Sequence, residues 1–457
     1  MLRSVRTRLS AMMFLFYFSL GSWAVTAGTY LMSAPTKGGL NFTTEQVGWI
    51  YSTFAIGGML AMPLVGILVD RLFRADRVLA VASLACGGFL LLASAWCESV
   101  EPEIGDVYAS LVDAESANGR PLRQHPEFSS AETPAEVKEA LDRVNDAPAM
   151  RAAARRVFIP LFIIMLAQSF CAQIVATLCT VITLRNLPDS ARHFSRTRMF
   201  GTIGWVVVGL AMGAVLRPIS PQPFLLAAVV SFLLGAYAFT LPNTPPQGHG
   251  KSLGEALGLP AFKLFRDRSF FVFIVVALLT TQMNQFYGVY GHRFLTDQGL
   301  VKPERWMTIG QLVEIGCMFA IPLLDPKRNM KWLMLLGAFG SALRAGAMIG
   351  GNNDLILALG VPMHGWSFAL YFVVAATFID REAPPTLRGS AQAISAFVCG
   401  GLGPWTGNLM AAAVVDRHRV GTHIDWPAVW MVPLVGCLIA TALFLIFFRT
   451  PVKPADV

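Results

Sequence analysis

The feature that most constrains the fold of this chain is a series of long apolar stretches separated by short polar segments. A bilayer core of about 30 Å is crossed by roughly 20 apolar residues in a helix. Twelve stretches meet or approach that length, at residues 9–31, 46–69, 77–97, 157–184, 198–217, 222–241, 269–292, 306–324, 331–350, 354–379, 389–415 and 427–448. The sequence therefore predicts an all-α membrane protein with twelve transmembrane helices.

Composition excludes several other classes of protein. Hydrophobic residues make up 54% of the chain and charged residues 14%, against roughly 25% charged residues in soluble domains. This composition excludes a disordered chain and disfavours a soluble enzyme. Six of the seven cysteines lie inside apolar stretches and Cys97 lies at the end of one, which favours buried thiols over a disulfide scaffold. The net charge of +8 would indicate nucleic-acid binding only if the basic residues clustered on a soluble surface, which they do not.

The basic residues instead follow an inside–outside alternation. Arg3, Arg6 and Arg8 precede the first stretch, which is too long for a signal peptide and lacks a small-residue cleavage site. If the N-terminus is inside, the inner segments hold 21 of the 36 Lys and Arg residues, whereas the short outer loops hold 7. This asymmetry is the positive-inside pattern of an even number of spans. We expect both termini in the cytoplasm and a multi-pass protein of the cell inner membrane.

Two polar segments divide the chain. Residues 242–267, which include PNTPPQGHGKS, are predicted to form a cytoplasmic linker between an N-terminal half (1–241) and a C-terminal half (268–457), each with six helices. Two such halves are typical of a secondary transporter with its binding site at the midplane between them.

The second polar segment, residues 98–156, is predicted to be an extracytoplasmic insertion with an acidic excess. Thr133 and Glu136 have capping-box spacing and are followed by helical spacing of Val137, Leu141 and Val144. A helical hairpin or flap is one interpretation of this segment, and a partly disordered spacer is the other.

A motif between the second and third stretches supports the transporter hypothesis. Gly66, Asp70 and Arg71, followed by Arg74 and Arg77, form a sequence that resembles the Gly-x-x-x-Asp-Arg loop of the major facilitator superfamily. A glycine permits close approach of helices, and an aspartate there can pair with a basic side chain or cap a helix.

Polar side chains inside the apolar stretches are candidate site residues, because they are costly in a membrane. Four groups share a helical face: Arg198, Thr202 and Trp205; Gln282 and Gln285; Gln311 and Glu314; His364, Phe368 and Tyr371. A cation, a carboxylate, amides and aromatic surfaces suit a neutral, polyhydroxylated ligand with a flat apolar part.

Structural roles remain open for most of these residues. Arg198 can mark the cytoplasmic start of its helix, and the two glutamines can join helices by hydrogen bonds. His364 can be a satisfied buried imidazole, and Trp205 and Phe368 can be core or lipid-facing. Glu314 has no inexpensive structural role in its apolar surroundings, and Arg344 is either its partner or a separate buried ion.

The same residues give the chain a specific family resemblance. The motifs are Gly21-Ser22-Trp23 with Thr26, Gly28, Tyr30 and Leu31; Arg198-x-x-Gly-Thr-Ile-Gly-Trp205; Gln311-x-x-Glu314; Arg388-Gly-Ser-Ala-Gln392 with Gly400, Gly401 and Gly403; and Asp425-Trp426-x-x-Val429-Trp430. In this order they resemble the nucleoside–proton symporters of the major facilitator superfamily. The resemblance implies that Arg198, Thr202, Trp205, Gln285, Gln311, Glu314, His364 and Phe368 occupy nucleoside-site positions.

Three positions depart from the family pattern. Gly288 stands where the family has asparagine, His364 where it has tyrosine, and Ala369 where it has aspartate. Without that aspartate, Glu314 is the main acid in the proposed site and the predicted proton carrier, since a buried carboxylate can titrate near neutrality. His364 is the alternative carrier.

The resulting functional prediction is proton-coupled nucleoside uptake by alternating access. Its partners are a nucleoside, a proton and the lipid bilayer, with no cofactor, metal or nucleic acid. The alternatives are a related carrier for sugars or another small polar solute, and a membrane receptor whose acidic outer loop binds a protein. An enzyme is disfavoured because no His-Glu-x-x-His, Gly-x-Ser-x-Gly or P-loop motif occurs.

Overall fold

The described part of the chain is almost entirely helical, as the sequence predicts. A computed structural model describes residues 2–117, 135–187, 190–215, 217, 219–246, 254, 259–324, 326–351, 353–384, 387–420 and 423–449. Within these ranges, the strands are β1 (Arg419–Val420) and β2 (His423–Ile424), which pair antiparallel.

The helices before the linker pack mainly with one another. They are α1 (Leu2–Ala24), α2 (Ala27–Met32), α3 (Thr44–Ile67), α4 (Ala75–Ala117), α5 (Ala135–Asp146), α6 (Pro148–Asn186), α7 (Ser190–Val215) and α8 (Gln222–Ala238), with the short turns η1 (Pro35–Lys37) and η2 (Leu68–Leu72). The α4 helix lies against α6 and α8, α1 against α7, and α3 against α6.

The helices after the linker form a second group. They are α10 (Arg268–Asp297), α11 (Pro303–Ala320), α12 (Pro326–Ile349), α13 (Asn353–Leu355), α14 (Pro362–Ser367), α15 (Val374–Glu382), α16 (Arg388–Phe397), α17 (Gly403–Arg417) and α18 (Trp426–Phe447). Short segments of other helix types join or precede them. The 3-10 helices are η4 (Leu259–Arg266) and η5 (Ile321–Leu324), and the π-helices are η6 (Ile356–Gly360), η7 (Phe368–Val373) and η8 (Val398–Leu402).

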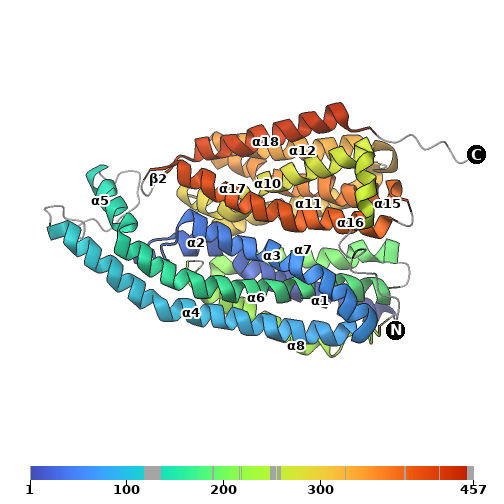
Figure 1. Cartoon of the computed structure of the whole chain (residues 1–457), viewed down its shortest axis with the longest axis horizontal. Helices are drawn as coiled ribbons and strands as arrows, with labels where there is room; N and C mark the ends of the chain where they lie inside the picture. Colours follow the sequence, from blue (N-terminus) through green and yellow to red (C-terminus); the bar gives the residue numbers. More distant parts are fainter. Residues whose placement is uncertain are drawn as a thin grey trace, which may run out of the picture.

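The two groups lie side by side, with α1–α8 below and α10–α18 above in Figure 1. The α3 helix contacts α17, and α7 contacts α11, across the boundary between them. The start of α1 and the end of α18 lie at one end of the bundle, which we call the terminus end.

Nine helical segments in the described part of the chain are long and apolar enough to cross a membrane. The α8 helix is apolar but shorter, with 17 residues. The expected count of twelve spans, the orientation of the termini and the boundaries of the two halves therefore stay predictions.

The α4 and α6 helices extend beyond the bundle at the opposite end, which we call the hairpin end, and α5 lies at their tip (Figure 1). The α4 helix runs to Ala117, past the end of the apolar stretch at residue 97, and α6 begins at Pro148, before the stretch that starts at residue 157. Val100, Ile104, Tyr108 and Val112 are buried at four-residue spacing along α4. Such an apolar stripe is sufficient for packing on a neighbouring helix.

The amphipathic α5 packs through the residues that the sequence singled out. Val137, Leu141 and Val144 are buried against this extension. The described parts of the insertion are therefore helical. The capping-box prediction falls on Thr133, which lies outside the described residues.

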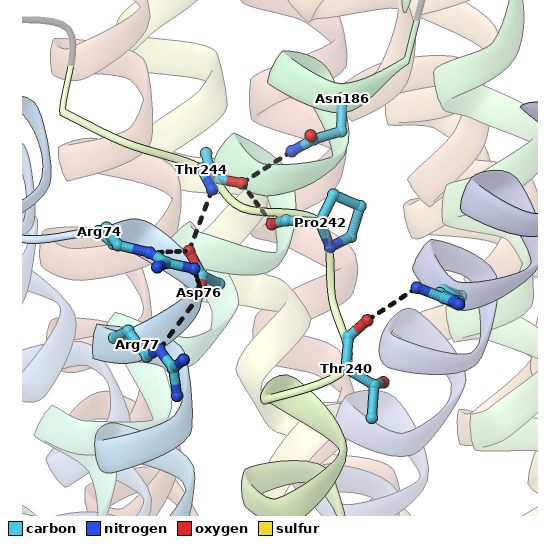
Figure 2. A network of polar contacts seen from close by, with 8 residues as sticks. Arg74, Asp76, Arg77, Asn186, Thr240, Pro242 and Thr244 are labelled. Carbon is cyan, nitrogen blue, oxygen red and sulfur yellow. Dashed lines mark hydrogen bonds and ion pairs between the residues drawn. The ribbon is translucent and has the colours of Figure 1, made fainter. Parts of the chain in front are cut away.

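At the terminus end, a polar network fixes the chain that leaves α8 (Figure 2). The Asp76 carboxylate, buried at the start of α4, accepts a hydrogen bond from the Thr244 backbone N–H over 3.0 Å and pairs with Arg74 over 2.8 Å. Asn186 of α6 donates to the Thr244 hydroxyl over 2.8 Å. The sequence had assigned a capping or pairing role to Asp70, whose side chain lies outside the described set.

Candidate functional site

The buried carboxylate of Glu314 lies where the two helix groups meet. Glu314 is on α11 and is 7% exposed. From the other group, the Thr202 side chain and the Arg198 guanidinium, both on α7, lie close enough to interact with it. The structure thus brings Arg198, Thr202 and Glu314 together across the boundary between the groups.

The Arg198 side chain lies over an aromatic ring of α1. Its guanidinium carbon is 4.0 Å from the centroid of the Tyr17 ring, a geometry that stabilises a cation in a poorly hydrated site. Trp205, two turns further along α7, is half-buried against α1 at Gly21.

The glutamines of α10 lie against α17. Gln282 donates to the Thr406 hydroxyl over 2.9 Å, so it does join two helices as the structural interpretation proposed. Gln285 donates to the Thr281 carbonyl of its own helix over 3.3 Å and is half-buried. Gly407 permits this close packing, because a Cβ there would lie 2.8 Å from the Gln285 side chain.

A glycine contact brings His364 of α14 beside Gln311 and Glu314 of α11. A Cβ at Gly365 would overlap the Gly310 carbonyl oxygen and lie 2.5 Å from the Glu314 backbone nitrogen. The Gln311 Oε1 atom is buried here without a hydrogen-bond partner among the described residues. A buried amide oxygen is rarely left unpaired in a native protein, so this atom is available to accept a hydrogen bond.

Arg344 of α12 forms a hydrogen bond with His364. The Arg344 Nη1 donates to His364 Nδ1 over 3.1 Å, and its Nη2 donates to Asn284 Oδ1 over 2.5 Å. The Tyr287 ring covers the guanidinium carbon at 5.1 Å and lies 5.0 Å from the His364 ring. These partners show that Arg344 is a buried ion separate from Glu314.

The predicted aromatic face of the tenth stretch is only partly correct. Phe368 is half-buried, with its ring 5.7 Å from that of Phe372. Tyr371 is instead fully buried in the core of the second group, where its hydroxyl donates to the Phe273 carbonyl. The chain is π-helical over Phe368–Val373, and the wider π-turn changes the direction of the side chains that follow.

Sequence reasoning missed Asn284, Tyr287 and Tyr17 as neighbours of the site. Asn284 lies one turn before Gly288 on the same face of α10, so an amide is retained near the position where the family pattern has asparagine. The two tyrosines carry no signal in the sequence, because they contact the site through helices that only the fold brings together.

Two groups of apolar helices, with a buried carboxylate, amides and a cation at their contact, define a membrane transporter of solutes rather than an enzyme. The chain matches the profile of the nucleoside H+ symporter family over residues 3–102 and 139–453, and it belongs to that family. It is thus a nucleoside transporter, as the family resemblance implied.

Relatives and solved structures agree with this assignment. YegT of Escherichia coli (strain K12) is 31% identical over 97% of this chain and 93% of its own length. The xanthosine permease of the same organism is 26% identical over 98% of this chain and 96% of its own. The crystal structure of nucleoside transporter NupG covers 98% of this chain and 100% of its own, with a TM-score of 0.74 and 21% identity. The D-xylose–proton symporter structure covers 97% and 98%, with a TM-score of 0.65 and 14% identity; at these identities the likeness concerns the fold.

Proposed function

We propose that this protein takes up nucleosides together with protons across the cell inner membrane, by alternating access to a site at Glu314. The observation that carries the proposal is the burial of this carboxylate beside Arg198 and Thr202, which belong to the opposite helix group. A ligand that binds there contacts both groups at once, so its binding can be coupled to their relative movement.

The membrane arrangement proposed for this mechanism follows the charge distribution. Twelve spans form two halves, 1–241 and 268–457, joined by a linker at 242–267. The terminus end faces the cytoplasm, where the inner segments hold 21 of the 36 basic residues. The hairpin end, with the insertion 98–156, faces outward.

The polar residues suit recognition of a ribose. Glu314 and Gln311 lie within one turn on α11, and carboxylate and amide oxygens can accept hydrogen bonds from vicinal hydroxyls. The unpaired Gln311 Oε1 supports this role. Gln285 would complete the polar contacts, while Arg198 would orient the ligand and stabilise the ionised form of Glu314.

The aromatic residues and His364 suit recognition of a base. Trp205 and Phe368 are half-buried and supply flat surfaces for stacking. A guanidinium has donors only, so the His364 Nδ1 that faces Arg344 must accept the hydrogen bond. The ring then carries its proton on Nε2, which can donate to a carbonyl oxygen or ring nitrogen of a nucleobase.

Proton coupling at Glu314 would arise from the attraction between its carboxylate and Arg198, which belong to opposite helix groups. The ionised carboxylate attracts Arg198, whereas the protonated form does not, so protonation changes the free energy of bringing α7 and α11 together. A buried charge that loses its partner is strongly unfavourable. Separation of the groups therefore favours a protonated Glu314.

Uptake of labelled uridine and adenosine by cells that lack their own carriers tests the proposal. We expect saturable uptake that unlabelled nucleosides reduce and sugars or free nucleobases do not. Competition by sugars alone would favour a sugar carrier, which the fold likeness to the D-xylose–proton symporter makes the second candidate. Ligand binding without uptake would favour a receptor.

A further inference from the structure

Three buried polar side chains link the helix groups at the hairpin end, away from the site at Glu314. Thr29 lies on α2 of the first group, and His292 and Glu304 lie on α10 and α11 of the second. The Thr29 Oγ1 is 2.7 Å from His292 Nδ1, and the Glu304 Oε2 is 3.3 Å from His292 Nε2. All three are at most 4% exposed.

This contact is tightly packed, so His292 and Glu304 are shielded from water. A Cβ at Gly28 would lie 2.8 Å from the Val289 carbonyl oxygen, and one at Gly209 would lie 2.6 Å from the Thr308 methyl group. The Glu304 Oε1 is buried without a hydrogen-bond partner among the described residues. A carboxylate with one unpaired oxygen in such a place is costly if it is ionised and uncompensated.

Further hydrogen bonds close the same end of the boundary. The Tyr290 hydroxyl donates to the Thr44 carbonyl over 2.9 Å, and the Thr44 hydroxyl donates to Asp416 over 3.1 Å. These contacts, together with that of Thr29 and His292, must break when the hairpin end opens.

The other ionisable groups at this end carry both signs of charge. They are Arg293, Asp297 and Tyr290 on α10, Lys302 before α11 and Arg305 on it, Lys37 on η1, Tyr30 on α2 with Glu101 on α4, Glu45 on α3, Asp416 and Arg417 on α17, His418 after it, Arg419 on β1, His423 on β2, and Asp425 before α18. Arg293 pairs with Asp297 over 2.9 Å, and Tyr30 donates to Glu101 over 3.0 Å. The protonation of His292 and Glu304 themselves therefore decides the charge that closure buries.

A single proton makes this pair neutral. With no added proton, a neutral imidazole beside an ionised carboxylate carries one negative charge. One proton gives either an imidazolium with a carboxylate or an imidazole with a carboxylic acid. Both arrangements keep a partner for each ring nitrogen, and both avoid the burial of a net charge.

We propose that His292 and Glu304 form a proton-binding site in the gate at the hairpin end, which must hold one proton before the gate can close. The proton comes from the medium on that side and returns to it when Thr29 moves away and the gate reopens. It is distinct from the proton that drives net uptake at Glu314. The proposal rests on the proposed function, since it assumes nucleoside transport and an outward-facing hairpin end.

Nucleoside exchange in right-side-out vesicles at fixed internal pH tests this site. Exchange needs the gate to close but needs no gradient. Because closure needs one bound proton, we expect the exchange rate to fall as the external pH rises, by at most about tenfold per pH unit, the slope of one proton. Glu304→Gln replaces the carboxylate with a neutral amide, so its exchange should lose this dependence on external pH.

Two further variants keep the test decisive. Glu45→Gln alters an exposed acid at the start of α3, at the same end, and should retain the wild-type pH profile. If Glu304→Gln does not fold, His292→Gln combined with Glu304→Gln retains hydrogen-bonding groups at both positions and should likewise be insensitive to external pH. The measurements are made in the wild-type and Glu314→Gln backgrounds, so that the acid at the substrate site is excluded as the source.

The outcomes separate this inference from the proposed function. An unchanged pH profile in folded Glu304→Gln overturns the inference while nucleoside exchange persists. A response to internal rather than external pH overturns it as well. Absence of nucleoside exchange in the wild-type protein overturns the proposed function instead.

Discussion

The Arg344 guanidinium donates a hydrogen bond to Nδ1 of His364 over 3.1 Å, which ties α12 to α14 and fixes the state of the imidazole. An imidazolium would place an N–H and a second positive charge against a group that can only donate. The ring is therefore neutral, with its proton on Nε2. His364 is thus suited to donate to a ligand and unsuited to carry a proton.

This relationship predicts the behaviour of two His364 variants. His364→Gln retains an N–H donor and should keep measurable nucleoside uptake, whereas His364→Phe should lose most of it. Neither variant should move the pH profile of the remaining uptake, since the imidazole stays neutral throughout. A shifted profile in His364→Gln, measured as initial uptake rate against pH, would return the histidine to the position of proton carrier.

Glu314→Gln should separate exchange from accumulation. The amide keeps the shape and hydrogen-bonding capacity of the carboxylate but cannot titrate. We expect the variant to exchange labelled for unlabelled nucleoside across a vesicle membrane, while it no longer concentrates nucleoside under an imposed pH gradient. Gradient-driven accumulation by this variant would show that Glu314 binds the ligand without carrying the proton.

Gln311→Ala and Gln285→Ala should each weaken nucleoside binding. Loss of a hydrogen bond to a buried ligand costs about 1–3 kcal/mol, and the Gln311 Oε1 has no partner among the described residues to compete with the ligand. Equilibrium binding to purified protein measures the change. Gln222→Ala, at the exposed start of α8, is the matched control and should bind normally. Unchanged affinity in both site variants would place the ligand elsewhere.

The orientation can be tested by thiol labelling of a cysteine-free variant. Ser110 is exposed on the α4 extension. Lys263 is exposed in η4, which directly precedes α10. An impermeant reagent should label Ser110→Cys in intact cells and Lys263→Cys only after the cells are broken. The reverse pattern would invert the proposed topology.

The network at the terminus end should contribute to stability. Asp76 is buried and accepts hydrogen bonds from both Arg74 and the Thr244 backbone. Asp76→Asn removes the charge from these bonds, and we expect a loss of about 1–3 kcal/mol, seen as a lower Tm in detergent. Thr240→Ala removes an exposed hydroxyl of the same segment and should change stability by less than about 0.5 kcal/mol. An equal effect of the two substitutions would argue against the network.

The insertion shows where prediction from sequence was incomplete. Hydropathy ended the apolar stretch at residue 97, before Glu98, Glu101 and Glu103, and it gave no end for the helix itself. The structure continues α4 to Ala117, since membrane-scale hydropathy is not required where one helix packs on another. The spacing of Val137, Leu141 and Val144 did predict α5, because a helical period is a local property.

The candidate site likewise combines residues that the sequence predicts with contacts that only the packing of helices produces. The sequence identified Glu314, Arg198 and Gln311 because charges and amides are rare and costly inside apolar helices. It left the partner of Arg344 open, since Asn284 and His364 are distant from it along the chain. It also placed Tyr371 with Phe368, because it assumed an α-helical turn where the chain is π-helical.

The sequence by itself determined the all-helical membrane architecture, the family and the polar residues available for a site, because apolar length, periodicity and residue type are read along the chain. Only the tertiary structure decided which of those residues meet. It placed Thr202 and Arg198 against Glu314, it set Arg344 behind His364, and it buried the pair of His292 and Glu304 beneath Thr29. These contacts depend on how two groups of helices pack together, and no local pattern in the sequence encodes that packing.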